Sequence, residues 1–237
     1  MTDNAEAPRR FYKLVSVGGE DGRTVLLDGR RVRTPAGASL SAPTPALAQM
    51  LAAEWEVQGE AILTATMPAV RLASTAIDRV SQTHAEVAQE VARYAGTDLL
   101  CYRAGHPRSL QERQETLWGA WLSWARDELG IELKTTIGVG HVAQPPQSLE
   151  RARELATALD DFSLTALAHA TSMLGSAILA FALQRGALDG EQAFALSQLD
   201  EDFQIAQWGL DEEAAQRRAA MLAEAQVLDA WFRALEG

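Results

Sequence analysis

The residues most able to do chemistry lie in one acidic stretch, SQLDEDFQIAQWGLDEE, at residues 197–213. Asp200, Glu201 and Asp202 are consecutive, and no basic residue occurs between Arg185 and Arg217. Such a stretch could form a catalytic carboxylate pair, a metal site, a docking surface or a solvated helix face. Consecutive helical residues point in three directions, at about 100° per residue. The three acids are therefore not the converging pair that general acid–base catalysis needs.

Helical periodicity places an apolar stripe beside Glu201. On a single helix over residues 190–208, Phe194, Ile205 and Trp208 lie on the side of Glu201, within about 40° of it. Gln204 borders this stripe. Either another helix of the chain covers the stripe or a protein partner does, and Glu201 itself could be an ordinary solvated carboxylate. The opposite face, expected to meet the core, carries Ala195, Leu196, Leu199, Phe203 and Ala206.

The histidines, the cysteine and the glycine-rich segment indicate no catalytic residue, metal ligand or cofactor site. None of the four histidines lies three to five residues from another, so the paired spacing of zinc ligands is absent. His84 with Glu86 and Glu90 is best explained as a solvated helix face. Cys101 has apolar neighbours, which favours a small buried side chain over a nucleophile. GVGHVA at residues 138–143 lacks the strand and helix of a dinucleotide-binding fingerprint.

Composition narrows the class of protein. A hydrophobic content of 47% and a charged content of 22% are typical of a soluble globular chain. The net charge of −11 argues against nucleic-acid binding and against docking to anionic membranes. The longest apolar run is shorter than the roughly 20 residues of a membrane span, so no stable membrane insertion is expected. The single cysteine fits a reducing compartment, and MTDNAEAPRR resembles no transit peptide, which favours the bacterial cytoplasm over the mitochondrial matrix.

The residue patterns along the chain predict an α+β fold. They indicate a small β-rich N-terminal domain at 1–70 and a larger α-helical domain at 71–237. A strand is expected over 11–17, and TVLLDGRRVRTP predicts a hairpin about Asp28 and Gly29. A helix over 44–60 would carry Trp55 and Gln58 on one face with two leucines. Residues 62–70 are expected to be extended.

The sequence from about residue 109 onward predicts mainly helices. Ser109 and Glu112 form a capping-box pattern, and the helix that they open carries Trp118, Trp121 and Trp124 as a core stripe. Further helices are expected over 148–160, 162–185, 190–208 and 212–235. Asp189 is the expected N-cap, and Gly209 the expected end, of the helix over 190–208.

Six segments together give the chain a resemblance to the ATP12-type assembly chaperones of the F1 sector of ATP synthase. They run over most of the chain, from about residue 11 to 210, in a matching order and spacing. The segments are RFYK (Arg10–Lys13), LDGRRVRTP (Leu27–Pro35), EWEVQ (Glu54–Gln58), TMP (Thr66–Pro68), TDLLCYRA (Thr97–Ala104) and LDEDFQIAQWG (Leu199–Gly209).

The resemblance implies a chaperone rather than an enzyme, one that binds the F1 α subunit before it joins β, without nucleotide hydrolysis. It also implies that an acid in the last segment matters, with Glu201 the first candidate and Asp202 the second. We expect Gln204, Ile205, Trp208 and Phe194 to complete this partner-binding surface, and the protein to be a monomer.

One further candidate site and two rival functions stay open at this point. Trp55 and Gln58 are a second, weaker partner-binding candidate, and they could instead hold the two domains together. An enzyme of unknown reaction with a site in the interdomain cleft is the main rival function. An acidic adaptor for another partner is the second rival.

Overall fold

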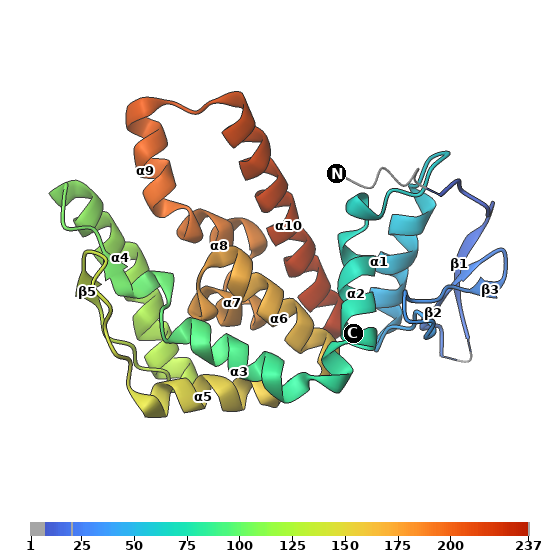
Figure 1. Cartoon of the computed structure of the whole chain (residues 1–237), viewed down its shortest axis with the longest axis horizontal. Coiled ribbons are helices and arrows are strands. Elements are labelled where there is room, and N and C mark those ends of the chain that lie inside the picture. The colour runs from blue at the N-terminus through green and yellow to red at the C-terminus, as the bar shows by residue number, and fades with distance from the viewer. Residues whose placement is uncertain (1–7, 20, 237) are drawn as a thin grey trace, which may run out of the picture. The chain divides into compact units, whose positions relative to one another are not determined.

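The computed structural model describes residues 8–19 and 21–236, which fold as two compact units (Figure 1). The first unit comprises Met1–Gln82 with Arg233–Gly237, and the second comprises Thr83–Phe232. Strands and helices in the first unit and mostly helices in the second confirm the expected α+β fold. Domain boundaries at 1–70 and 71–237 remain a prediction.

The first unit packs a small sheet against a helix. Its elements are β1 (Val15–Gly18), β2 (Thr24–Leu27), β3 (Arg30–Arg31), α1 (Pro45–Glu56), the 3-10 helices η1 (Thr64–Thr66) and η2 (Val80–Gln82), and α2 (Pro68–Asp78). The strands are antiparallel in the order β1-β2-β3. The hairpin about Asp28 and Gly29 is confirmed, with φ of 48° and 76° at these residues. The Asp28 carboxylate accepts hydrogen bonds from the backbone N–H groups of Lys13 and Leu14, which lower its pKa.

Two expectations for this unit are wrong. The first strand begins at Val15 rather than near residue 11, and residues 64–66 and 68–70 are helical rather than extended. Pro68 opens α2, because its fixed φ suits the first helical turn, where a missing N–H costs nothing. Both carboxylate oxygens of Glu54 accept hydrogen bonds of 2.8 Å from the first free N–H groups of α2, at Ala69 and Val70. Because Glu54 precedes Ala69 by 15 residues in the sequence, no local capping pattern predicted the start of α2.

The second unit is built from helices, with one short pair of strands. Its elements are α3 (His84–Ala95), η3 (Leu99–Cys101), β4 (Tyr102–Arg103), α4 (Arg108–Trp124), the π-helical turn η4 (Ala125–Leu129), β5 (Thr136–Ile137), α5 (Pro146–Thr157), α6 (Asp161–Leu174), α7 (Ala177–Gln184), α8 (Gly190–Ser197), α9 (Leu199–Trp208) and most of α10 (Glu212–Glu236), which enters the first unit at Arg233. Helix α7 lies at the centre, with every residue from Ala177 to Leu183 buried. No helix in the described part of the chain is both long and apolar enough to span a membrane.

Three local predictions in this unit need correction. The helix expected over 162–185 is interrupted at Gly175, whose φ of 65° ends α6 before Ser176 caps α7. Ser109 does not cap α4, which begins one residue earlier after Pro107 and has no side-chain cap. Of the three tryptophans on α4, only Trp118 is fully buried; the other two are half-buried and pack edge to face on each other.

Candidate functional site

The acidic stretch spans two helices, α8 and α9, rather than the single helix expected over 190–208. Gln198 separates them with φ of −100° and ψ of 14°, and the two helices run in different directions (Figure 1). The expected ends are confirmed: Asp189 and Gln192 form a capping box at the start of α8, and Gly209, with φ of 81°, ends α9. The interruption contains neither Pro nor Gly, so the sequence carried no breaker signal.

The change of direction removes Phe194 from the stripe beside Glu201. Phe194 is only 3% exposed, and the guanidinium carbon of Arg218 lies 5.0 Å from the centre of its ring. The expectation that Phe194 belongs to the partner-binding surface is therefore contradicted, because the rotation of 100° per residue does not continue across Gln198. Of the residues on the expected core face of α9, only Leu199 is buried. Phe203 is half-buried and Ala206 is exposed.

The three consecutive acids have three different environments. Asp200 accepts a hydrogen bond of 2.6 Å from the buried amide of Gln114 on α4. Asp202 forms an ion pair of 2.5 Å with Arg218 on α10. Glu201 is exposed, and its carboxylate has no hydrogen bond or ion pair within the described residues. Asp200 and Asp202 thus hold α9 in place, and of the three acids only Glu201 has no partner for its carboxylate in the described structure.

This division predicts different effects of the two candidate acids on stability. Asp202→Ala should lower the free energy of unfolding by about 1–2 kcal/mol, because it leaves the half-buried guanidinium of Arg218 without its carboxylate. Glu201→Ala should change it by less than about 0.5 kcal/mol. Thermal melts followed by circular dichroism would test this. Equal melting temperatures for the two variants would contradict the assignment of Asp202 as structural.

The free side of α9 forms one wall of a groove whose other wall is α10. The groove encloses about 360 Å³ and contains Glu201, Gln204, Ile205 and Trp208 from the predicted site. Trp208 is 83% exposed. Figure 1 shows α9 and α10 running antiparallel from the short connection after Gly209. The structure thus places four predicted residues along one groove.

The second wall was missed by the sequence reasoning. It includes Leu210, 44% exposed, together with Arg217 and Met221 from α10. A usable signal was present, since Arg217 and Met221 are four residues apart and therefore lie on one face of a helix. Arg217 is paired with Glu213 at 2.5 Å, so its charge is balanced locally. The groove therefore combines exposed apolar side chains with polar groups and the unpaired carboxylate of Glu201, which suits protein docking better than catalysis.

Comparison with known proteins identifies the family to which the chain belongs. The model of the ATP12 chaperone protein family matches residues 9–126. The crystal structure of Atp12 from Paracoccus denitrificans is 40% identical, with a TM-score of 0.89, over 96% of this chain and 98% of that chain. The chain belongs to the ATP12 chaperone family.

Two further relatives agree with this assignment. The structure of an Asp-to-Lys mutant of Atp12p from Paracoccus denitrificans has a TM-score of 0.88 and 40% identity, over 96% of this chain and 97% of that chain. The mitochondrial protein atp12 of Schizosaccharomyces pombe is 29% identical over 87% of this chain and 75% of its own length. The family resemblance inferred from the six segments is thus confirmed, and the chain is a chaperone of the ATP12 family that serves F1-ATPase assembly.

The second candidate pair of this ATP12 chaperone, Trp55 and Gln58, lies within the first unit. Gln58 is 6% exposed; its amide donates to the Glu54 carbonyl and the Thr66 hydroxyl, and its oxygen accepts from the Leu63 N–H. These bonds fix the loop after α1, so the side-chain amide of Gln58 is committed to the fold of the first unit. Trp55 is half-buried and lines clefts of the first unit.

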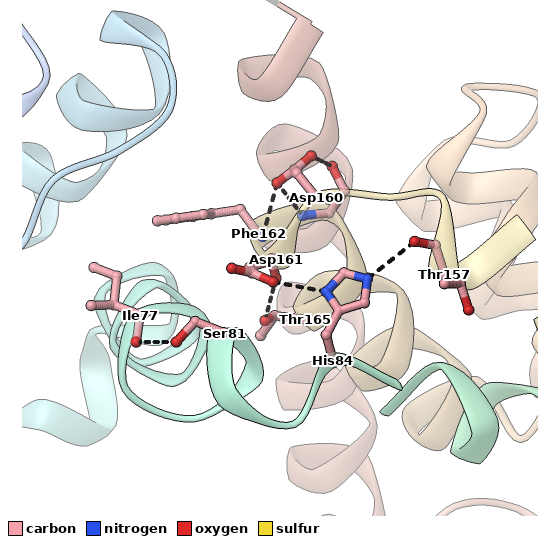
Figure 2. Close-up of polar contacts among 9 residues, drawn as sticks. Ile77, Ser81, His84, Thr157, Asp160, Asp161, Phe162 and Thr165 are labelled. Carbon is pink, nitrogen blue, oxygen red and sulfur yellow. Dashed lines mark hydrogen bonds and ion pairs between the residues drawn. The ribbon is translucent and has the colours of Figure 1, made fainter. Parts of the chain in front are cut away.

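The histidine considered as a metal ligand is engaged by the protein itself. Figure 2 shows the His84 ring between Asp161 and Thr157. Its Nδ1 lies 2.8 Å from an Asp161 carboxylate oxygen, and its Nε2 lies 3.2 Å from the Thr157 carbonyl oxygen. Among the described residues, no group of three His, Cys, Asp or Glu side chains could hold a metal ion. His84 thus joins α3 to the start of α6.

Cys101 is buried, as predicted. Its side chain is fully inaccessible, and burial raises the pKa of the thiol to about 12. A thiol of that pKa is protonated at neutral pH, whereas a nucleophile needs the thiolate. Cys101 therefore belongs to the core of the second unit.

Proposed function

We propose that this ATP12-family chaperone binds the unassembled α subunit of F1-ATPase on the surface that α later presents to β. The groove of α9 and α10 supports this, because it offers the exposed ring of Trp208 and the side chains of Ile205 and Leu210 beside the carboxylate of Glu201. An unassembled subunit exposes apolar surface destined for its neighbour, which makes it prone to aggregation. The exposed apolar groove is the single observation on which the proposal rests.

Glu201 would give the contact its specificity. It stands at the groove without an internal partner in the described chain, so it is free to pair with an Arg or Lys of α. Such a pair at the edge of an interface raises the association rate and selects the correct partner more than it adds affinity. A groove of about 360 Å³ covers only part of a stable interface, so it serves as one anchor among several contacts.

Release follows from competition. The β subunit displaces the chaperone if the α–β contact is the more favourable, so no nucleotide hydrolysis, cofactor or catalytic residue is needed. We place the protein as a monomer in the bacterial cytoplasm, without nucleic-acid partners or membrane insertion. No observation on the described residues specifically favours the alternative of an enzyme.

Co-expression of the tagged chain with separate F1 α and F1 β subunits from the same source tests the function. We expect α, and not β, to be retained on the tagged chain, and added β to release it. Retention of neither subunit, with α soluble on its own, would leave only the family membership and refute the proposed role.

Glu201→Lys tests the site within that function. We expect retention of α to fall about tenfold, because reversing an interface charge replaces an attraction with a repulsion. The melting temperature should stay unchanged, since Glu201 is exposed and unpaired in the described structure. Glu128→Lys, an equal charge change at an exposed glutamate of the second unit, is the matched control. Undiminished retention by Glu201→Lys, or equal loss in the control, would exclude Glu201 as a contact.

A further inference from the structure

Two clefts of the first unit adjoin at Trp55 and Arg33, which line both of them. One encloses about 590 Å³ and reaches from Trp55 to Phe11. The other encloses about 650 Å³ and reaches from Trp55 to Arg71 and α2. Each volume lies in the range of about 300–1,000 Å³ that is usual for ligand sites. Segments from β3, the end of α1 and α2 therefore form one continuous surface around Trp55.

This surface is basic on a strongly acidic protein. Five arginines line the two clefts, against two aspartates, which gives a net formal charge of +3, whereas the whole chain carries −11. The lining arginines are Arg30, Arg31, Arg33, Arg71 and Arg79. Such a reversal of sign over one hollow surface attracts anionic groups toward it.

The two aspartates are already committed to the fold. Asp78 accepts hydrogen bonds of 2.6 Å from the Thr34 hydroxyl and 3.0 Å from the Ala36 N–H. Asp28 binds the backbone of the first strand region, as described above. In contrast, Arg31 and Arg71 are exposed, and their guanidinium groups form no ion pair or hydrogen bond with residues 8–19 and 21–236. Their guanidinium groups can each take a carboxylate in a bidentate pair.

The walls also offer apolar and aromatic surface. Phe11 is 74% exposed, and the ring of Tyr12 packs edge to face on Trp55 with 5.8 Å between the ring centres. The floor of the larger cleft includes Met67 and Val70. Four of the segments that carry the family resemblance meet here, and the groove of α9 and α10 uses none of them. They are Arg10–Lys13, Leu27–Pro35, Glu54–Gln58 and Thr66–Pro68.

We propose that this surface of the first unit is a second docking site, which takes an extended acidic segment of a protein partner that also carries apolar side chains. Carboxylates of the segment pair with Arg31 and Arg71, and its apolar side chains lie against Trp55 and the aromatic wall. The charge complementarity selects this occupant, since a basic or neutral segment gains nothing from five arginines. The site is independent of the groove of α9 and α10.

The test uses the full chain and a fluorescein-labelled peptide in which Glu alternates with Leu. A peptide of about twelve extended residues has a reach of roughly 40 Å. We expect saturable binding by fluorescence anisotropy that weakens as salt screens the charges. The Arg31→Glu, Arg71→Glu double variant should bind at least about tenfold more weakly, whereas Arg113→Glu, Arg126→Glu should change binding less than about twofold. Both pairs change the net charge equally, and the control pair is exposed on the second unit.

Several outcomes would overturn the proposal. They are the absence of saturable binding to the unmodified chain, equal loss in both double variants, equal binding of a Lys–Leu peptide, and tighter binding of a single-stranded oligonucleotide of the same charge. If circular dichroism shows that the double variant does not fold, the Arg31→Gln, Arg71→Gln double variant replaces it. This variant should also bind the peptide more weakly than the unmodified chain does. Because the probe is a peptide and not F1 α, failure here would leave the result for Glu201 untouched.

Discussion

Trp208→Ala is expected to weaken capture of the F1 α subunit about 30-fold or more, because an interface tryptophan that acts as a hot spot contributes about 2 kcal/mol or more. The melting temperature should not change. Trp208 is 83% exposed, so its truncation removes almost no packing inside the chaperone. A quantitative pull-down from cells that co-express α would measure the loss. Trp208→Phe should keep most of the binding, since an aromatic ring remains in the groove.

A matched control separates binding at this groove from nonspecific binding to any exposed apolar side chain. Ile137 is 63% exposed on β5 and does not line the groove, so Ile137→Ala should retain α fully. If Trp208→Ala and Ile137→Ala lose α equally, or if neither does, the groove is not where α binds.

The part of the site that could be predicted is local. Helical rotation from Glu201 to Trp208 holds because all eight residues lie on α9, and it correctly separated the directions of the three acids. The hairpin at Asp28 and Gly29 was also predictable, since both residues need positive φ and the two types that tolerate it stand there. Short-range geometry of this kind is encoded within a few residues.

The part that could not be predicted depends on distant contacts. α8 approaches α10 closely, since a Cβ on Gly190 would lie only 2.4 Å from the carbonyl oxygen of Ala225. α9 is instead held by Gln114 through Asp200 and by Arg218 through Asp202. Gln114 lies 86 residues from Asp200 in the sequence, and Arg218 lies 16 residues from Asp202, so the change of direction at Gln198 depends on residues outside the local sequence. The burial of Phe194 is a consequence of that turn and not of its local sequence.

Asp98→Ala is expected to lower the melting temperature by roughly 10 °C, an effect of about 3–4 kcal/mol in a chain of this size. Asp98 is fully buried in the segment Thr97–Ala104, and its carboxylate accepts three hydrogen bonds. They come from the Ser176 hydroxyl at 2.8 Å, the Leu100 N–H at 3.0 Å and the Ile178 N–H at 3.1 Å. Alanine would leave these donors buried without an acceptor at the start of α7. The exposed cap Asp160 is the control: Asp160→Ala should cost only about 1 kcal/mol.

The same carboxyl should give the stability a pH dependence. Burial raises the pKa of Asp98 from 3.8 to about 6, although its hydrogen bonds act in the opposite direction. The folded state therefore holds a proton that the unfolded state has released, and the stability that this proton gives is lost as pH rises from about 4 to 6. Asp98→Asn removes the titration, so its destabilisation relative to the unmodified protein should be about 1 kcal/mol smaller at pH 7.5 than at pH 5. Urea unfolding at the two pH values measures this difference. A destabilisation that is equal at both, or larger at pH 7.5, would mean that the three donors keep Asp98 ionised in the folded core.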